Sequence, residues 1–155
     1  MHKNKLAKKG PTEMLIAKDI MTEDVISVKK DTSIYEAIDI LAENRIAGIP
    51  VVEDDMTLIG ILSEKDVLSL LFFYGQDDDK EEKTVGDFMT QPAIHFGEDE
   101  SLMDVCDCLT NSDFRRVPIT SGGKLVGIVS RADIIECIRH LRREHVKASV
   151  EEANS

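Results

Sequence analysis

The chain has 155 residues, a net charge of −11 and an apolar content of 42%. That length fits one compact domain or two small fused units. The negative charge argues against general binding to nucleic acid or to an anionic membrane, since both require a cationic protein surface. Aromatic residues make up 5% and Trp is absent, so we expect an aliphatic core and few stacking platforms for single-stranded nucleic acid.

Cysteine usage and hydropathy favour a cytoplasmic protein. Cys106, Cys108 and Cys137 form no Cys-x-x-Cys pair, so neither a disulfide framework nor a zinc site is expected. The four histidines show no metal-ligand spacing, and we predict no metal. No segment is apolar for long enough to span a membrane, and the N-terminus lacks the apolar stretch of a signal peptide.

The first predicted elements follow an N-terminal basic tail, residues 1–16, which carries Lys3, Lys5, Lys8 and Lys9. A short strand is predicted at 25–28. A helix follows, because apolar residues recur at i, i+3, i+4 and i+7 from Ile34 to Leu41. Ser33 and Glu36 form a capping-box signature at its start.

A hairpin and a second helix complete the first set of elements. Apolar runs at 49–52 and 58–62 flank a turn at 53–56, which predicts two paired strands. The helix after Ser63 is expected to present Val67, Leu68 and Leu71 on its apolar side. The acidic stretch 76–84 then reads as an exposed linker, because it holds few apolar residues.

The same order of elements returns in the second half. Asp-Ile-Met-Thr at 19–22 returns as Asp-Phe-Met-Thr at 87–90, and Ile-Pro-Val at 49–51 returns as Val-Pro-Ile at 117–119. A strand at 93–96, a helix from 102, a hairpin around 121–124 and a last helix are therefore predicted. The sequence predicts an α+β fold of two β-α-β-β-α repeats, at 17–75 and 85–142, with a C-terminal tail at 143–155.

These motifs in this order, twice over, resemble the cystathionine-β-synthase (CBS) domain family. The resemblance covers roughly residues 17 to 141. It implies two repeats packed with pseudo-two-fold symmetry, head-to-head or head-to-tail dimers, and clefts that bind adenosine derivatives. The regulatory ligand is then expected to be AMP, ADP, ATP or S-adenosylmethionine, with no cofactor beyond it.

Ser63-x-x-Asp66 and Ser130-x-x-Asp133 lie where a strand passes into a helix. A carboxylate can accept hydrogen bonds from both ribose hydroxyls, and a helix N-terminus favours phosphate. The same spacing is also a good helix cap.

The resemblance implies that each cleft combines this motif with strands of the other repeat. Site A would comprise Ser63, Asp66, Thr90, Ile94, Arg116, Val117 and Pro118. Site B would comprise Thr22, Ile26, Gly48, Ile49, Pro50, Ser130 and Asp133.

Only site A contains an arginine, two places before its proline, where CBS pairs often contact phosphate. Guanidinium is a bidentate phosphate partner, so site A is predicted to be the stronger phosphate site. Site B would hold a neutral adenosine moiety, with Arg131 or nothing for charge. Alternatively, Arg115 and Arg116 are solvated charges after a helix. The isoleucines and Val117 of both sites would form apolar walls for a base, or pack in the core.

No catalytic signature is present, so we predict a non-enzymatic regulatory module that senses an adenosyl ligand and signals to a partner protein. A homodimer is expected, because Leu68, Leu71, Phe72 and Phe73 are apolar for a monomer surface. Two alternatives stay open. One is a ligand-free dimerisation or scaffold module, and the other is a nucleic-acid regulator that uses the basic ends, against which the net charge counts.

Overall fold

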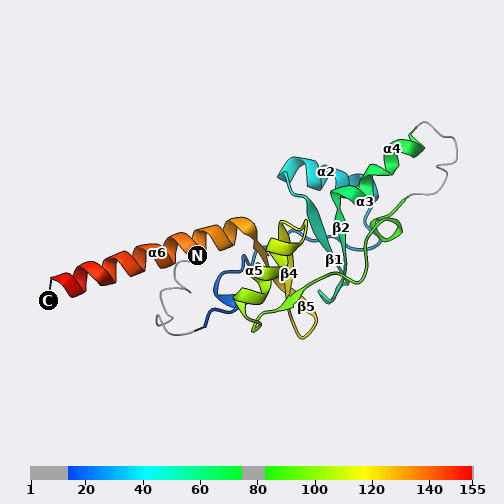
Figure 1. The fold of residues 1–155 in the computed structure, drawn as a ribbon. Helices are drawn as coiled ribbons and strands as arrows, with labels where there is room; N and C mark the ends of the chain where they lie inside the picture. Colours follow the sequence, from blue (N-terminus) through cyan, green and yellow to red (C-terminus); the bar gives the residue numbers. More distant parts are fainter. Residues whose placement is uncertain (1–13, 75–82, 155) are drawn as a thin grey trace. The chain divides into compact units, whose positions relative to one another are not determined.

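The fold is that of a computed structural model, which describes residues 14–74 and 83–154 (Figure 1). The lysines of the predicted basic tail and residues 76–82 of the predicted linker lie outside these ranges. Helices and strands follow one another in two similar sets, so the predicted α+β class with tandem repeats is confirmed.

The first set starts with a 3-10 turn and continues as helix, hairpin and two short helices. Its elements are η1 (Ala17–Asp19), α2 (Ile34–Asn44), β1 (Gly48–Val52), β2 (Leu58–Ser63), α3 (Glu64–Leu68) and α4 (Leu70–Phe73). The second set has the same order with two differences: the short strand β3 precedes its first helix, and a single long helix ends it. Its elements are η2 (Val85–Asp87), β3 (Phe96–Gly97), α5 (Leu102–Asn111), β4 (Arg116–Ser121), β5 (Lys124–Ser130) and α6 (Arg131–Ala153).

The predicted helix starts and hairpins are present. The side chains of Ser33 and Ser101 accept hydrogen bonds from the second amides of α2 and α5, at 3.3 and 3.2 Å. The bonded amide is thus at N2, rather than at N3 as in a capping box. Strands β1 and β2 pair antiparallel, and β3, β4 and β5 form one sheet in that order.

The predicted strand at 25–28 was wrong, and two further elements differ in extent from the prediction. At 25–28 the backbone makes only an isolated parallel bridge, between Val28 and Val51. The second predicted strand is shorter and starts later, at Phe96. Helix α6 runs to Ala153, so the segment after residue 142 is helical. Short apolar runs indicated the two strands at 25–28 and 93–96, but Ile26 and Ile94 in these runs are 41% and 53% exposed.

The described chain divides into two compact units that cross the repeat boundaries. Unit 1 comprises residues 14–23, 96–119 and 126–154, and unit 2 comprises residues 24–74, 83–95 and 120–125. The leading segment of each repeat therefore belongs to the unit that holds the helices of the other repeat. Repeats related in sequence are thus interleaved in the fold.

The core of unit 2 lies between α2, the β1–β2 hairpin and the leading segment of repeat 2. Ile34 and Ala37 of α2, Ile49 of β1 and Leu62 of β2 are fully buried there. Val85 is also fully buried in this cluster, although it belongs to the second repeat. Burying an aliphatic side chain of this size contributes about 1.5–3 kcal/mol, so the leading segment is an integral part of this core.

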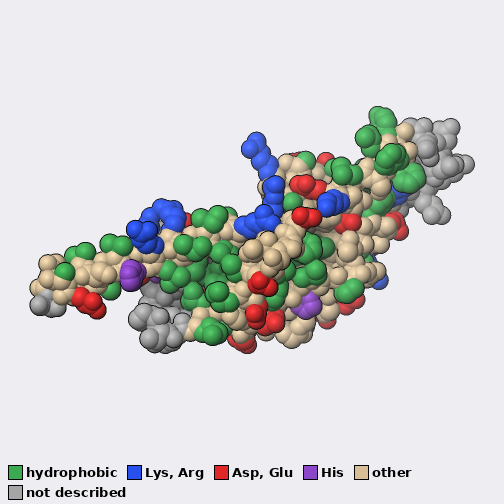
Figure 2. All heavy atoms as spheres, in the orientation of Figure 1, with side chains coloured by type: hydrophobic (Ala, Val, Ile, Leu, Met, Phe, Trp, Pro, Cys, Tyr) green, Lys and Arg blue, Asp and Glu red, His purple; other side chains and the backbone are tan. Residues whose placement is uncertain are grey.

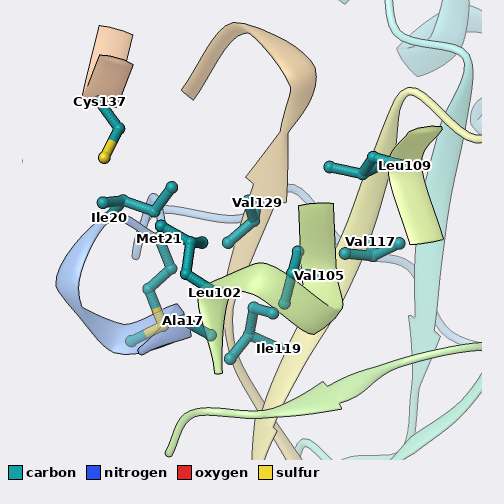
Figure 3. Close-up of a cluster of buried hydrophobic side chains, with 10 residues drawn as sticks. All are labelled: Ala17, Ile20, Met21, Leu102, Val105, Leu109, Val117, Ile119, Val129 and Cys137. Atoms are coloured by element: carbon teal, nitrogen blue, oxygen red, sulfur yellow. The ribbon is translucent and has the colours of Figure 1, made fainter. Parts of the chain in front are cut away.

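The core of unit 1 has the corresponding arrangement with the repeats exchanged (Figure 3). Ala17, Ile20 and Met21 of the first repeat pack among side chains of α5, β4 and β5. Cys137 anchors α6 to this cluster with 4% of its surface exposed. As the aliphatic composition predicts, Phe96 is the only aromatic side chain packed against this cluster among the described residues.

Candidate functional site

The Ser63-x-x-Asp66 motif closes the N-terminus of α3. The Ser63 amide donates to Asp66 Oδ2 at 2.8 Å, and the Ser63 hydroxyl donates to the same oxygen at 2.9 Å. In return, the Asp66 amide donates to Ser63 Oγ at 3.3 Å. This reciprocal pair is a capping box, so the helix-cap interpretation of the motif is confirmed.

The second carboxylate oxygen of Asp66 reaches the other repeat. The Thr90 hydroxyl donates to Asp66 Oδ1 at 3.0 Å. Thr90 is held in place by its backbone, which exchanges two 2.9 Å hydrogen bonds with Ile61 of β2. Ile94 lies in the same unit with 53% of its surface exposed. Unit 2 thus contains four residues predicted for site A, namely Ser63, Asp66, Thr90 and Ile94.

The remaining three residues predicted for site A belong to unit 1. Arg116 is the first residue of β4 and is half-buried, while Val117 and Pro118 are fully buried. Val117 is part of the unit 1 core, which confirms the packing interpretation for that side chain. The composite form of site A stays a prediction.

Residues predicted for site B divide in the same way. In unit 1, the Ser130 amide donates to Asp133 Oδ2 at 2.9 Å, and the Asp133 amide donates to Ser130 Oγ at 3.1 Å. Thr22 exchanges backbone hydrogen bonds of 2.8 and 2.9 Å with Ile128 of β5. The other four predicted residues, Ile26, Gly48, Ile49 and Pro50, belong to unit 2.

Two details of site B bear on its chemistry. The Arg131 guanidinium donates to the Ser112 carbonyl at 2.9 Å, so this side chain is already engaged within unit 1. Ile49 and Pro50 are buried, whereas Ile26 is 41% exposed. Of the predicted apolar walls, only Ile26 and Ile94 present accessible surface, because Ile49 and Val117 are core residues.

Two glycines, one in β2 and one in β5, allow the leading segments to lie close to these strands, because they have no side chain. A Cβ on Gly60 would lie 2.7 Å from the Thr90 carbonyl oxygen, and one on Gly127 would lie 2.5 Å from Met21 Sδ. Gly60 and Gly127 occupy corresponding places in the two repeats, and the sequence analysis assigned them no role. Their recurrence at corresponding positions of β2 and β5 was the signal that a backbone approaches closely there.

Neither metal nor membrane features stand out in the described part. Within residues 14–74 and 83–154, no three His, Cys, Asp or Glu side chains group as metal ligands would. Within the same ranges, no helix has both the length and the apolar content that crossing a bilayer requires.

The CBS domain family matches the chain twice, over residues 17–72 and 85–140. This chain belongs to the CBS domain family. Among curated relatives of the CBS pair, the uncharacterized protein MJ1225 of Methanocaldococcus jannaschii is 34% identical over 121 residues, which are 78% of this chain and 42% of the relative. The chain spans 42%, 62% and 64% of the length of three curated relatives that it matches.

Solved CBS pairs share the fold and some hold adenosyl ligands. The crystal structure of Arabidopsis thaliana CBSX2 in complex with AMP is 30% identical, with a TM-score of 0.72 over 82% of this chain and 98% of that chain. The CBS domain pair of MJ0100, in complex with 5′-methylthioadenosine and S-adenosyl-L-methionine, is 28% identical. Its TM-score is 0.65, over 81% of this chain and 97% of the other.

Proposed function

We propose that this CBS pair is a regulatory module that binds an adenosyl ligand, with AMP as the first candidate, at a site built around Asp66. The observation that carries the proposal is the hydrogen bond between Asp66 and Thr90. It brings an acceptor and a hydroxyl from two repeats together at the start of a helix. Ile94, in the same unit, is accessible.

Asp66 retains capacity for a ribose. A carboxylate offers about four acceptor positions. Two are used on Oδ2 by Ser63, and one on Oδ1 by Thr90. A ribose hydroxyl can take the remaining position on Oδ1 or replace Thr90 there, and bonds to a charged acceptor are worth about 1.5–3 kcal/mol. The exposed surface of Ile94 supplies apolar contact for a purine.

The comparisons support an adenosyl ligand rather than fixing which one. CBSX2 holds AMP, and MJ0100 holds 5′-methylthioadenosine with S-adenosylmethionine. The parts common to these ligands are the adenine and the ribose, which are the parts that Asp66 and Ile94 suit. We assign the phosphate of AMP to Arg116, and we assign site B, which has Gly48 at the place of Arg116, to a second and weaker adenosine position.

The proposed role of the chain is to regulate a partner protein, and no catalysis is assigned to it. Ligand binding would change the packing between copies or with a partner protein, and that partner would read the change. We further propose a homodimer, since Leu68, Leu71, Phe72 and Tyr74 are each at least 67% exposed. These side chains also favour the second candidate, a dimerisation module that binds no ligand.

Thermal unfolding with added nucleotide tests the proposal. Ligand at about 100 times its dissociation constant adds roughly 2.7 kcal/mol to the free energy of unfolding, which corresponds to a rise of roughly 5–10 °C. AMP, ADP, ATP and S-adenosylmethionine are each added to protein shown to be free of nucleotide. We expect AMP to raise the melting temperature of the wild type.

The matched variants are Asp66→Ala and Asp87→Ala. Asp87 accepts from the Thr84 amide at 2.9 Å, as Asp66 does from Ser63, but Asp87 lies outside both predicted sites. Both variants are expected to unfold earlier without ligand, because each loses a cap. Only Asp66→Ala should lose the additional rise with AMP. If no adenosyl ligand changes the wild-type melting temperature, the dimerisation module becomes the better interpretation.

A further inference from the structure

Helix α6 continues well beyond the core that holds it. Ile134 and Cys137 pack on the unit 1 core, but every residue from 141 to 154 is exposed. The helix spans 23 residues, which is about 35 Å at a rise of about 1.5 Å per residue. A helical segment as long as its exposed part is marginal in water without packing. A surface that packs on this part would therefore stabilise it.

One side of the exposed part combines cations with two valines. Helical residues that lie three or four positions apart are neighbours on the same side, and six residues are linked by these spacings. We call them the basic face of α6, and they are Arg139, Arg142, Arg143, Val146, Lys147 and Val150. Figure 2 shows Lys and Arg side chains gathered over this helix.

The basic face lies on the side of α6 away from the core of its own unit. Val146 follows Cys137 by about two and a half helical turns, so the two side chains leave the helix on opposite sides, and Cys137 is the one buried in the core. Val146 and Val150 are 46% and 54% exposed, and the side chain of Arg139 is 57% exposed. The face is thus accessible to a partner.

Most cations of the basic face are uncompensated. Arg139 Nη1 pairs with Glu136 Oε2 at 3.1 Å, but Arg142, Arg143 and Lys147 form no ion pair within the described part of the chain. The whole chain has a net charge of −11, so this face is a local reversal of the overall charge. Arginine binds carboxylate in a bidentate geometry, and the face therefore suits an anionic partner.

The two valines distinguish among anionic partners. Nucleic acid offers mainly phosphates to such a face, and the net charge of the chain opposes its approach. A helix that lies on a membrane inserts Leu, Phe or Trp side chains, and the basic face contains none of them. A protein segment with aliphatic side chains between its carboxylates complements both the cations and the valines.

We infer that the basic face of α6 is the surface through which this module contacts its partner protein, and that the partner presents an acidic segment with aliphatic side chains. The inference rests on the proposed function, which requires a partner, and adds the chemistry of that partner. Helix α6 begins at the cap made by Ser130 and Asp133, which are predicted for site B. The ligand motif and the partner surface therefore lie on one continuous helix.

Fluorescence anisotropy of the full chain with a labelled synthetic peptide tests the inference. In this peptide, glutamates and leucines recur at helical spacing, and a control peptide has the same composition in an order that gives its leucines no common side. We expect the first peptide to bind about fivefold more tightly than the control. Arg142→Glu with Arg143→Glu should weaken it about tenfold. Val146→Ala with Val150→Ala should weaken it about threefold, because alanine keeps the helix and removes apolar contact.

The matched control variant is Lys18→Glu with Lys30→Glu, two exposed lysines outside α6. It changes the net charge as much as the arginine reversal does and should leave the affinity unchanged, and circular dichroism verifies that each variant is folded. The inference is overturned by a wild type that does not bind the peptide, by unchanged affinity in either α6 variant, or by an equal loss in the control. Tighter binding to duplex DNA or to phosphatidylglycerol vesicles would also overturn it. Calorimetric titration of AMP into the same samples tests the proposed function separately, so the two failures are distinguished.

Discussion

The carboxylate of Asp66 divides its oxygens between two tasks. Oδ2 completes the cap of α3, and Oδ1 faces Thr90. Removal of such a cap costs about 0.5–2 kcal/mol, so an alanine at this position lowers stability whether or not a ligand binds. An effect of Asp66→Ala on stability alone is therefore no evidence for a ligand, and only a ligand-dependent change is informative.

Arg116 is the residue by which the phosphate assignment is tested. Arg116→Ala should weaken AMP about tenfold to a hundredfold, because a charge-assisted hydrogen bond contributes about 1.5–3 kcal/mol. Adenosine lacks the phosphate and should bind both proteins alike. Isothermal titration calorimetry with AMP and adenosine measures the two affinities.

Arg115→Ala is the control for this prediction. Arg115 is the exposed neighbour of Arg116, and its carbonyl accepts from the Arg131 amide, a bond that an alanine keeps. Equal losses of AMP affinity in the two variants would point to general electrostatic attraction. An unchanged affinity in Arg116→Ala would show that the phosphate lies elsewhere.

Sequence reasoning reached the local chemistry of single residues but not their long-range neighbours. The caps at Ser63 and Ser130 follow from a spacing of three residues, which a sequence displays directly. The contact between Asp66 and Thr90 joins residues 24 positions apart, and only the family resemblance placed them in one site. The exposure of Ile94, against the burial of Val117, depends on packing that no local pattern encodes.

At the scale of elements, α6 is held to its unit by few side chains. Cys137 is the buried one, and burial raises the pKa of its thiol, with a smaller effect from the carboxylate of Asp19. Cys106 and Cys108 on α5 are only partly buried. The reactivity of the Cys137 thiol therefore reports on how firmly α6 is docked, and the two thiols on α5 serve as references.

Iodoacetamide should modify Cys137 last. The thiolate is the reactive form, and a raised pKa leaves less of it at pH 8. Burial also restricts access until α6 leaves the core. Peptide mass spectrometry over a time course gives the three rates, and labelling in urea provides the control in which the rates converge. Early labelling of Cys137 in native protein would contradict a docked α6.

The lengths of elements were predicted less well than their order. Helices α2 and α5 were located because four apolar positions recur with helical spacing. The helix after Ser63 instead breaks into α3 and α4, and Leu68 and Leu71, expected on its apolar side, are 67% and 81% exposed. Apolar residues that serve a surface look the same in a sequence as those that serve a core.

At the scale of the whole molecule, neither unit is encoded by one continuous repeat. Val85 is fully buried in unit 2, and Ala17 is fully buried in unit 1, although each belongs to the opposite repeat. The folding of each unit thus depends on both halves of the chain.

A chain divided between residues 78 and 79 should show this dependence. Each half alone lacks part of a core and should be largely unfolded, whereas the two halves together should associate and regain the helical signal of the intact protein. Circular dichroism of the separate and mixed halves measures the effect. A half that folds cooperatively by itself would contradict the interleaved arrangement.

The interleaving has a consequence for inheritance. A single repeat that was copied or lost would leave one leading segment without its strand and one core without its leading segment. We therefore expect related proteins to gain and lose these repeats in pairs. We also expect the pair to be the smallest portion of the chain that can be transplanted into another protein. A substitution in the leading segment of one repeat would likewise be compensated most readily by changes in the other.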